Sequence, residues 1–429
     1  MVVVMQRSGL VFRALGALGI LGFSSGCGAL IGISDVEYRE GGTSNDATTS
    51  GVDSAMPDGW TGTAPPDGGN PPGNVDAGTK DATMPVEASS PPDAAPLADA
   101  ADAADAADTA PSLPTSCLTT GDGLTNCGST NSESCCTTLE VEGGTVYRTF
   151  QSLPDGGAYN EDHPAKVSTF FLDKYEITVG RFRQYVQSLV AGGSAPANGS
   201  GIHKHVNGGL GVASDTGGHE SGWDATGWDG YIYTGPGAAG TWNANLACNA
   251  SYQTWTPAAG ANERLPITCV NWWQAYAFCI WDGGFLPTEA EWQYAAAGGS
   301  DQREYPWGAA DPGTSANSYA IFNCNFPTAG AGCSGVSNVA PVGTATLGGG
   351  RWGQLDLAGS VWEWNLDWYS NGVFVSPCQD CAYLTATAYR VFPGGGFNNA
   401  QQFLLPAIPY GFSAPSDLSN IGARCARSP

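Results

Sequence analysis

The clearest helical pattern in the chain lies at residues 179–189. Apolar side chains recur there three and four positions apart, which places them on one face of a helix: Phe182, Tyr185, Val186 and Leu189. Thr178 precedes the segment, and its hydroxyl oxygen can accept a hydrogen bond from a free N–H group of the first turn. The pattern therefore predicts an amphipathic helix with Thr178 as its N-cap.

Two further helices are predicted at residues 272–281 and 289–297. Asn271 can cap the first, and Thr288 with Glu291 has the spacing of a capping box for the second, which ends at two glycines. The connection between the two helices is short, which favours their packing as a pair. Gly-rich loops and 14 tryptophans predict that the remaining elements are short and are held by aromatic packing and disulfides.

The beginning of the chain has the pattern of a bacterial export signal. Arg7 and Arg13 precede an apolar stretch at 14–23 that is too short to cross a bilayer, and small residues follow it before Cys27. A small-residue run that ends in a cysteine also resembles the bacterial lipobox. We expect a signal peptide at 1–26 and lipidation of Cys27, which would anchor the protein to the outer membrane of a Gram-negative bacterium. Ordinary cleavage, which leaves a free thiol, is the alternative.

Residues 27–114 are predicted to form a disordered tether. From about residue 40 onward this segment consists of Asp, Ala, Pro, Gly, Ser and Thr with almost no large apolar side chain, so it cannot bury a core. Regularly spaced aspartates in the run that begins at Asp99 repel one another, and the prolines upstream forbid a continuous helix. The globular domain is therefore expected at residues 115–429.

The formal net charge of −24 says little about partners. Fifteen of the 40 acidic residues precede Cys117, and the remaining acids are spread along the domain, which favours a role in solubility. The sequence contains no basic patch of the kind that binds nucleic acid, so we expect no nucleic-acid partner. No second apolar run approaches the length of a membrane-spanning helix, so we expect membrane contact through the lipid anchor only.

The cysteine pattern predicts a disulfide-rich domain. Without Cys27, twelve of the 13 cysteines remain, an even number that suits an oxidising compartment. Cys324 and Cys333 are predicted to bridge their loop. For Cys378 and Cys381 a small structural disulfide is favoured over a redox dithiol or a soft-metal site, because a redox-type strand–helix context is missing. The sequence leaves open the pairing of six others: Cys117, Cys127, Cys135, Cys136, Cys248 and Cys269.

Five segments of the domain together resemble one known family. In chain order they read Phe171-Leu-Asp-Lys-Tyr-Glu-Ile-Thr, Leu286-Pro-Thr-Glu-Ala-Glu-Trp-Gln-Tyr-Ala, Leu357-Ala-Gly-Ser-Val-Trp-Glu-Trp, Arg390-Val-Phe-Pro-Gly-Gly-Gly-Phe and Gly422-Ala-Arg-Cys-Ala-Arg. They are similar to the formylglycine-generating enzymes, also called sulfatase-modifying factors. The resemblance implies a disulfide-stapled α+β domain of low regular structure with a C-type-lectin-like core.

The same resemblance implies a specific chemistry. Members of the family oxidise a cysteine of a sulfatase to formylglycine with O2 and a copper(I) ion held by two thiolates. The two catalytic cysteines match Asn399 and Leu404 here, and the active-site serine matches Gly396. Copper(I) is a soft ion that needs thiolate ligands, which neither an amide nor an isobutyl group supplies. We therefore expect that this chain binds no copper and has lost the oxidase activity.

Other positions of the site match the family better. Trp362 and Asn420 stand where the family places residues that line its substrate cleft, whereas Trp364 is interpreted as a core aromatic. The family's calcium ligands match two side chains and two backbone carbonyls: those of Asp356 and Glu363, and those of Gly359 and Val361. Calcium prefers several hard oxygen ligands, so it is the expected ion, with local hydrogen bonding as the alternative role of these carboxylates.

The resemblance also implies one disulfide and the loss of another. One family pairing maps onto Cys279 and Cys425, whereas the second maps onto Ala296 and Pro409, so both members of that pair are absent together. A bond between Cys279 and Cys425 would close a loop worth about 5 kcal/mol in the chain-entropy model.

Histidines add little to the predicted site. His203 and His205 lie in a Gly-rich loop with no carboxylate at a convincing spacing, so they are interpreted as solvated loop residues rather than as metal ligands.

Two functions from different classes are consistent with these patterns. The first is a surface-anchored pseudoenzyme or binding module, whose ligand would be a peptide, a glycan or a protein. The second is an active oxidoreductase of the same family that uses other metal ligands, for example Cys378 and Cys381 brought near the cleft.

Overall fold

The computed structural model describes residues 112–148, 163–313, 317–407 and 410–429. The predicted signal peptide, Cys27 and nearly all of the predicted tether lie outside the described residues, as does Pro409. No helix within the described ranges is long and apolar enough to cross a membrane.

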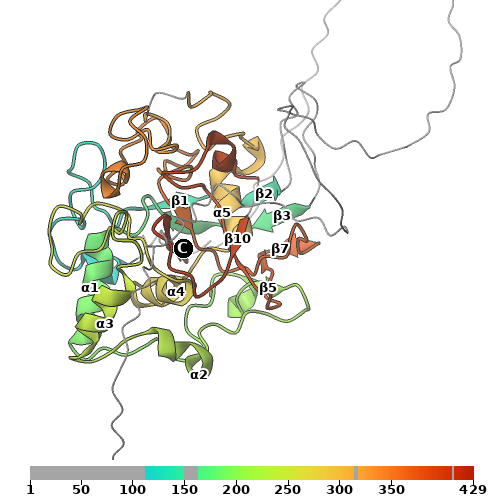
Figure 1. Ribbon diagram of the computed structural model, residues 1–429. Coiled ribbons are helices and arrows are strands. Elements are labelled where there is room, and N and C mark those ends of the chain that lie inside the picture. Colours follow the sequence, from blue (N-terminus) through green and yellow to red (C-terminus); the bar gives the residue numbers. More distant parts are fainter. Residues whose placement is uncertain (1–111, 149–162, 314–316, 408–409) are drawn as a thin grey trace, which may run out of the picture. The chain divides into compact units, whose positions relative to one another are not determined.

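The domain contains short helices and short strands joined by long loops (Figure 1). The described α-helices are α1 (Val179–Val190), α2 (Ala225–Trp228), α3 (Ala238–Asn245), α4 (Trp272–Trp281) and α5 (Glu289–Ala296). The described strands are β1 (Thr138–Val141), β2 (Gly144–Tyr147), β3 (Pro164–Val167), β4 (Phe170–Asp173), β5 (Ala213–Ser214), β6 (Trp362–Glu363), β7 (Cys378–Gln379), β8 (Cys381–Ala382), β9 (Arg390–Phe392), β10 (Tyr410–Phe412), β11 (Ile421–Gly422) and β12 (Ala426–Arg427). This mixed α+β architecture is the predicted fold class.

The strands form several small sheets. One has the order β1-β4-β12 with antiparallel neighbours, and a second has the order β2-β3-β7. The pairs β9–β10, β6–β11 and β5–β8 complete the described sheets. Strands β11 and β12 come from the end of the chain and pair with β6 and β4, so the C-terminal residues are held by strands from earlier in the sequence.

All three predicted helices are present, and their N-terminal caps explain where they begin. The Thr178 hydroxyl accepts a hydrogen bond from the backbone N–H of Arg181 at the start of α1. Asn271 with Gln274, and Thr288 with Glu291, form capping boxes at the starts of α4 and α5. Helix α1 extends one residue beyond the predicted end, and α5 stops one residue earlier.

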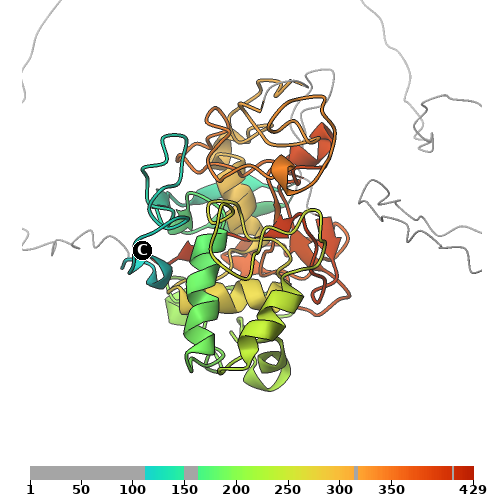
Figure 2. The same ribbon diagram turned by 60° about the vertical axis from the view of Figure 1, so that its left-hand side comes forward.

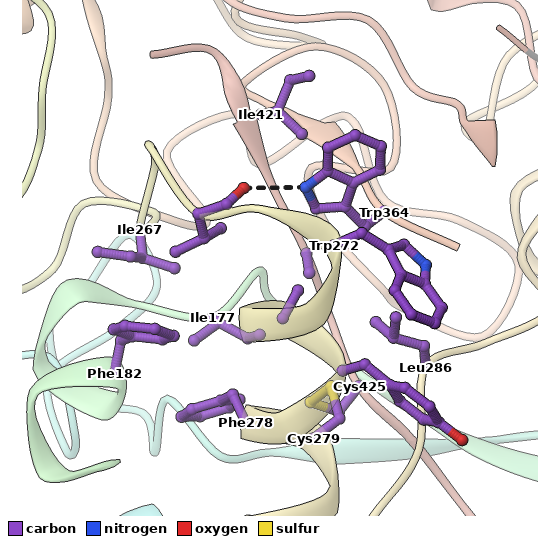
Figure 3. Packing of buried hydrophobic residues seen from close by; sticks show 14 of the residues in the cluster. Ile177, Phe182, Ile267, Trp272, Phe278, Cys279, Leu286, Trp364, Ile421 and Cys425 are labelled. Atoms are coloured by element: carbon purple, nitrogen blue, oxygen red, sulfur yellow. Dashed lines mark hydrogen bonds between the residues drawn. A yellow bond between two sulfur atoms is a disulfide. The ribbon is translucent and has the colours of Figure 1, made fainter. Parts of the chain in front are cut away.

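Aromatic side chains from α1, α3 and α4 form the largest core. Phe182 of α1 stacks on Phe278 of α4 with 5.6 Å between ring centroids, and it meets Trp242 of α3 edge to face. Figure 3 shows Phe182 and Phe278 together with Trp364, whose indole N–H donates to the backbone carbonyl of Val270. Trp364 is fully buried, so it is a core aromatic as predicted.

A buried ionic network ties the C-terminal strand β12 to this core. Arg181 of α1 and Arg427 of β12 both bond the carboxylates of Asp173 and Asp282. All four side chains are nearly inaccessible to water. Removal of one partner would leave an unpaired buried charge, which typically costs about 3–5 kcal/mol.

Six disulfides pair the twelve cysteines of the domain. Cys279 and Cys425 form the bond that the resemblance implied, with a sequence separation of 146. Cys324–Cys333 and Cys378–Cys381 are also bonded, as the sequence predicted. The pairings that the sequence left open are Cys117–Cys136, Cys127–Cys135 and Cys248–Cys269.

Candidate functional site

The residues that match the catalytic cysteines follow β9 in a tight turn. Gly394 and Gly395 have φ angles of 104° and 76°, a backbone conformation that other residues rarely adopt. This turn carries the following residues back toward β6, where the Phe397 N–H donates to the Ser360 carbonyl. Asn399 is thereby placed against Trp362 of β6.

Asn399 is a buried structural residue in this geometry. Its side-chain oxygen accepts hydrogen bonds from the Trp362 indole N–H at 2.8 Å and from the Gly396 backbone N–H at 3.1 Å. Only 4% of Asn399 and 1% of Trp362 is exposed. The amide oxygen therefore satisfies two donors that have little access to water.

Leu404 is equally closed to solvent. It is 1% exposed and belongs to a small apolar cluster with Tyr305, Ala320, Phe322 and Ala358. An aliphatic side chain stabilises such a cluster, whereas a thiolate there would carry an unfavourable buried charge.

Gly396 leaves little room for the serine of the family. A Cβ atom on Gly396 would lie 3.0 Å from the Asn399 side-chain oxygen and 3.2 Å from the Trp362 ring. The glycine therefore fits the space that Asn399 and Trp362 leave. Since no thiolate stands at positions 399 and 404, the residues present do not fit a copper(I) ion.

The two residues predicted to line a cleft are also enclosed. Trp362 contacts Phe392, Phe403 and Tyr410 edge to face, and Asn420 donates from its amide to the side-chain oxygen of Asn398. Asn420 is 3% exposed. The aromatic rings around Trp362 therefore pack against one another, and the amide of Asn420 is hydrogen-bonded within the protein.

A cluster of buried charges lies at the predicted calcium position. Both oxygens of Glu363 accept from Arg424, at 2.6 and 2.7 Å, and one of them also accepts from the Trp292 indole N–H. Asp356 accepts from the backbone N–H of Gly343 at 2.5 Å. Burial raises the pKa of Asp356 to about 6, although the hydrogen bond from Gly343 opposes this.

Glu176 joins the same cluster, although it was absent from the predicted ligand set. It is fully buried, and among the described residues neither of its carboxylate oxygens has a hydrogen-bond partner of good geometry, although the Ser360 hydroxyl lies near enough to favour its charged form. Burial, together with the negative charge of Asp356, raises the pKa of Glu176 well above its usual value. Its presence in the quoted segment Asp-Lys-Tyr-Glu-Ile-Thr was the available signal.

These observations bear on calcium in opposite ways. The unpartnered oxygens of Glu176 beside Asp356 are the kind of groups that a hard cation satisfies. Arg424, however, already binds the carboxylate of Glu363. The described residues contain no group of three or more His, Cys, Asp or Glu side chains that could hold a metal. Such a group consists of side chains only, whereas two of the four predicted calcium ligands are backbone carbonyls. Calcium therefore stays a prediction.

The interpretation of His203 and His205 as solvated loop residues is wrong. His203 is fully buried between two carboxylates, with its ring nitrogens 2.8 Å from Glu220 and 3.2 Å from Glu291. His205 stacks on Phe285, which also contacts His203. The carboxylates that sequence spacing failed to reveal come from the segment after β5, which contains Glu220, and from α5, which contains Glu291. Burial alone would lower the pKa of His203, but the two glutamates raise it to about 10.

Cys378 and Cys381 do not supply metal ligands. They form a disulfide between β7 and β8 and are 5% and 1% exposed. A disulfide sulfur is not a thiolate, so these residues do not support an oxidoreductase site near Trp362.

Comparison with known proteins decides the family. A family model described as "Sulfatase-modifying factor enzyme 1-like domain" matches residues 125–429. The chain belongs to this family. The match includes every position discussed above, from Glu176 to Arg424, and confirms the resemblance on which the site prediction rests.

Several family members of known name are similar to this chain. The formylglycine-generating enzyme of Streptomyces coelicolor is 30% identical over 294 residues, which cover 63% of this chain and 85% of that protein. The mouse formylglycine-generating enzyme is 31% identical over 40% of this chain, which spans half of the mouse protein. A bovine protein named "Inactive C-alpha-formylglycine-generating enzyme 2" is 32% identical over 40% of this chain and 53% of its own length.

The similarity to solved structures is weaker. The structure of PvdO from Pseudomonas aeruginosa is 17% identical, with a TM-score of 0.42 over 72% of this chain and 98% of that protein.

Proposed function

We propose that this chain is a surface-anchored family member that has lost the copper-dependent oxidase chemistry and acts as a binding module. Export and anchoring rest on the signal pattern that ends at Cys27. Loss of the oxidase rests on the residues at positions 396, 399 and 404.

The single observation that supports the proposal best is the engagement of Asn399. Its side-chain oxygen bonds the Trp362 indole and the Gly396 backbone, so the position is occupied by a structural amide. Leu404 is packed among apolar side chains. Both replacements suit their surroundings in the folded protein, which is what we expect if the domain is maintained for its structure rather than for turnover.

A similar protein gives this proposal a precedent. The bovine relative described above is named as an inactive formylglycine-generating enzyme. The Streptomyces coelicolor relative carries the name of the active enzyme at a comparable identity. Overall sequence similarity therefore does not decide whether this chain is an active or an inactive member of the family. The residues of the site are the better guide.

A turnover assay tests the loss of activity. The purified full chain, loaded with copper(I) in the presence of O2, is incubated with a cysteine peptide taken from a sulfatase, and mass spectrometry follows its conversion to the formylglycine product. The Streptomyces coelicolor relative is the positive control. We expect conversion by the control only. Conversion by this chain above the copper-only background would refute the proposal.

We further propose calcium as a structural ion at Asp356, Gly359, Val361 and Glu363. The buried, unpartnered oxygens of Glu176 next to Asp356 support it. Glu363 would then share its carboxylate between the ion and Arg424. Among the described residues Arg424 is the one arginine that faces the carboxyl groups of Glu176, Asp356 and Glu363, so the ion would add positive charge to this cluster.

A further inference from the structure

A loop at residues 371–376 covers a small pocket at the start of α5. The pocket has a volume of about 20 Å3, enough for one water molecule, and Gly372, Val373 and Val375 of the loop form part of its lining. Helix α5, drawn in light orange, lies against the blue-green strands β2 and β3 in both Figure 1 and Figure 2. We call the cavity the α5 pocket and residues 371–376 the pocket loop.

One side chain holds the pocket loop down. Arg148 directly follows β2 and donates to the Val375 carbonyl at 2.6 Å, and its guanidinium carbon lies 4.7 Å from the centre of the Phe374 ring. Within the described residues, this is the one hydrogen bond that reaches the pocket loop from beyond the two residues that precede it. Contacts of Phe374 with His163 and of Val375 with the second core add to the hold. Arg148 is therefore the polar latch of the loop.

The latch is anchored on a pair of buried carboxyl groups in the α5 pocket. Arg148 lies 3.3 Å from one carboxylate oxygen of Glu289, whose other oxygen has no hydrogen-bond partner among the described residues. Asp367 accepts from the backbone N–H groups of Glu289 at 2.7 Å and of Tyr383 at 2.6 Å. Only 5% of Glu289 and 4% of Asp367 is exposed. The closed loop thus keeps both carboxyl groups away from water.

The charges around this pair do not compensate its burial. Burial and the negative charge of Glu289 raise the pKa of Asp367 to about 7, although two backbone N–H groups and Arg148 oppose the rise. Burial also raises the pKa of Glu289, against the effect of Arg148. Arg390 is the other charged group that faces Asp367, and it is buried itself. In the closed form, ionisation of the pair is therefore costly.

Opening of the pocket loop would return the pair to water. A carboxyl group with a pKa of about 7 when covered and an ordinary pKa of 3.8 when hydrated holds its proton more firmly in the closed form. Low pH therefore favours the closed form. As the pH rises from about 4 to about 7, the equilibrium constant for opening should increase about tenfold per pH unit, and it should level off above about 7.

We propose that the pocket loop is a lid, that Arg148 latches it over Glu289 and Asp367, and that it opens when this pair ionises. Access to the α5 pocket would then depend on pH, because the two carboxyl groups and the rings of Trp368 and Tyr383 are uncovered only in the open form. The inference goes beyond the proposed function and is independent of the copper question. The pocket shares no residue with positions 396, 399 and 404.

Hydroxyl-radical footprinting of the full chain tests the inference. The radicals oxidise aromatic side chains in proportion to their access to water, and mass spectrometry reports the oxidised fractions of Trp368 and Phe374, which both line the pocket. Samples are compared in steps of about one pH unit from about 5 to about 8, the range in which the opening equilibrium should change. The exposed Leu347 corrects for radical dose, and the buried Trp364 stays unoxidised if the rest of the domain is folded.

Two variants and one control separate the latch from a general loosening of the domain. Arg148→Gln should give high oxidation at every pH, because the loop loses its latch. Asp367→Asn should remove most of the rise with pH, because the amide does not titrate. Arg351→Gln is the matched control and should behave like the native chain, since Arg351 also has an acidic partner and lies over a ring, that of Trp352, but is outside the pocket.

We expect the oxidation of Trp368 and Phe374 in the native chain to rise with pH and to level off above about 7. If Asp367→Asn does not fold, Glu289→Gln takes its place. Without the neighbouring negative charge the pKa of Asp367 falls, so the Glu289→Gln profile should level off at a lower pH.

Oxidation that does not change with pH in the native chain would overturn the inference. It would also be overturned by a native-like profile of Arg148→Gln, by a full rise with pH in Asp367→Asn, or by a Glu289→Gln profile that levels off where the native one does. The same loosening in Arg351→Gln as in Arg148→Gln would remove the specific role of the latch.

Discussion

Replacement of Asn399 by alanine should destabilise the domain through two hydrogen-bond donors that lose their acceptor. The Asn399 side-chain oxygen accepts from the Trp362 indole at 2.8 Å and from the Gly396 N–H at 3.1 Å, in surroundings that are almost closed to water. An unsatisfied buried donor costs about 1–3 kcal/mol. Because a water molecule can enter the space left by the amide and satisfy one donor, one donor stays unsatisfied and we expect a total loss of roughly 1–3 kcal/mol.

A double-mutant cycle with Trp362→Phe separates this effect from general packing. Phenylalanine keeps an aromatic ring near Phe392 but has no indole N–H, so Asn399→Ala should cost about 1–2 kcal/mol less in that background. The assay is urea unfolding of the full chain with its disulfides intact, followed by tryptophan fluorescence and far-UV circular dichroism. An equal cost of Asn399→Ala in both backgrounds, or a cost below about 0.5 kcal/mol in the native background, would refute the role assigned to Asn399.

Three further predictions follow from the site. Gly396→Ser alone should lower stability by about 1–3 kcal/mol, because the serine side chain meets the Asn399 oxygen. The same change should cost less in an Asn399→Cys background. Equal unfolding midpoints for Gly396→Ser and the native chain would contradict this prediction. The paired, buried charge of His203 should contribute stability below pH 6.5 that is lost as the pH rises through about 10. Over this pH range the native chain and the exposed control His219→Gln should each lose a few kcal/mol of unfolding free energy, whereas His203→Gln should not. Calcium should raise the melting temperature of the native chain and chelator should lower it, whereas Asp356→Asn should respond to neither; a native chain that is indifferent to both would remove calcium from the account.

The parts of the fold that could be predicted from the sequence are those in which the deciding contacts are local. The caps of α1, α4 and α5 join residues three positions apart, so the residue types at these positions predict where the helices begin. The short disulfides Cys324–Cys333 and Cys378–Cys381 are local in the same sense. The other six cysteines allow 15 pairings, and spacing does not select among them, although the bond Cys127–Cys135 is as local as Cys324–Cys333.

The environment of the site could not be predicted, because its contacts join distant parts of the chain. The resemblance identified which positions matter, but the bond from Trp362 to Asn399 spans 37 residues. His203 was placed in solvent because nothing in its own loop predicts that Glu291 of α5 will lie 3.2 Å from its ring. Glu176 was missed for a similar reason, since its neighbour Asp356 belongs to a segment far along the chain.

Copper(I) binding tests the central claim most directly. The full chain competes with a chromogenic copper(I) chelator, in parallel with the variant Asn399→Cys/Leu404→Cys, which restores two thiolates at the family's spacing. Since soft two-coordinate ligation needs both thiolates, we predict no detectable copper(I) uptake by the native chain and stoichiometric uptake by the double variant. Stoichiometric, tight copper(I) uptake by the native chain would contradict the claim that its oxidase site has been lost.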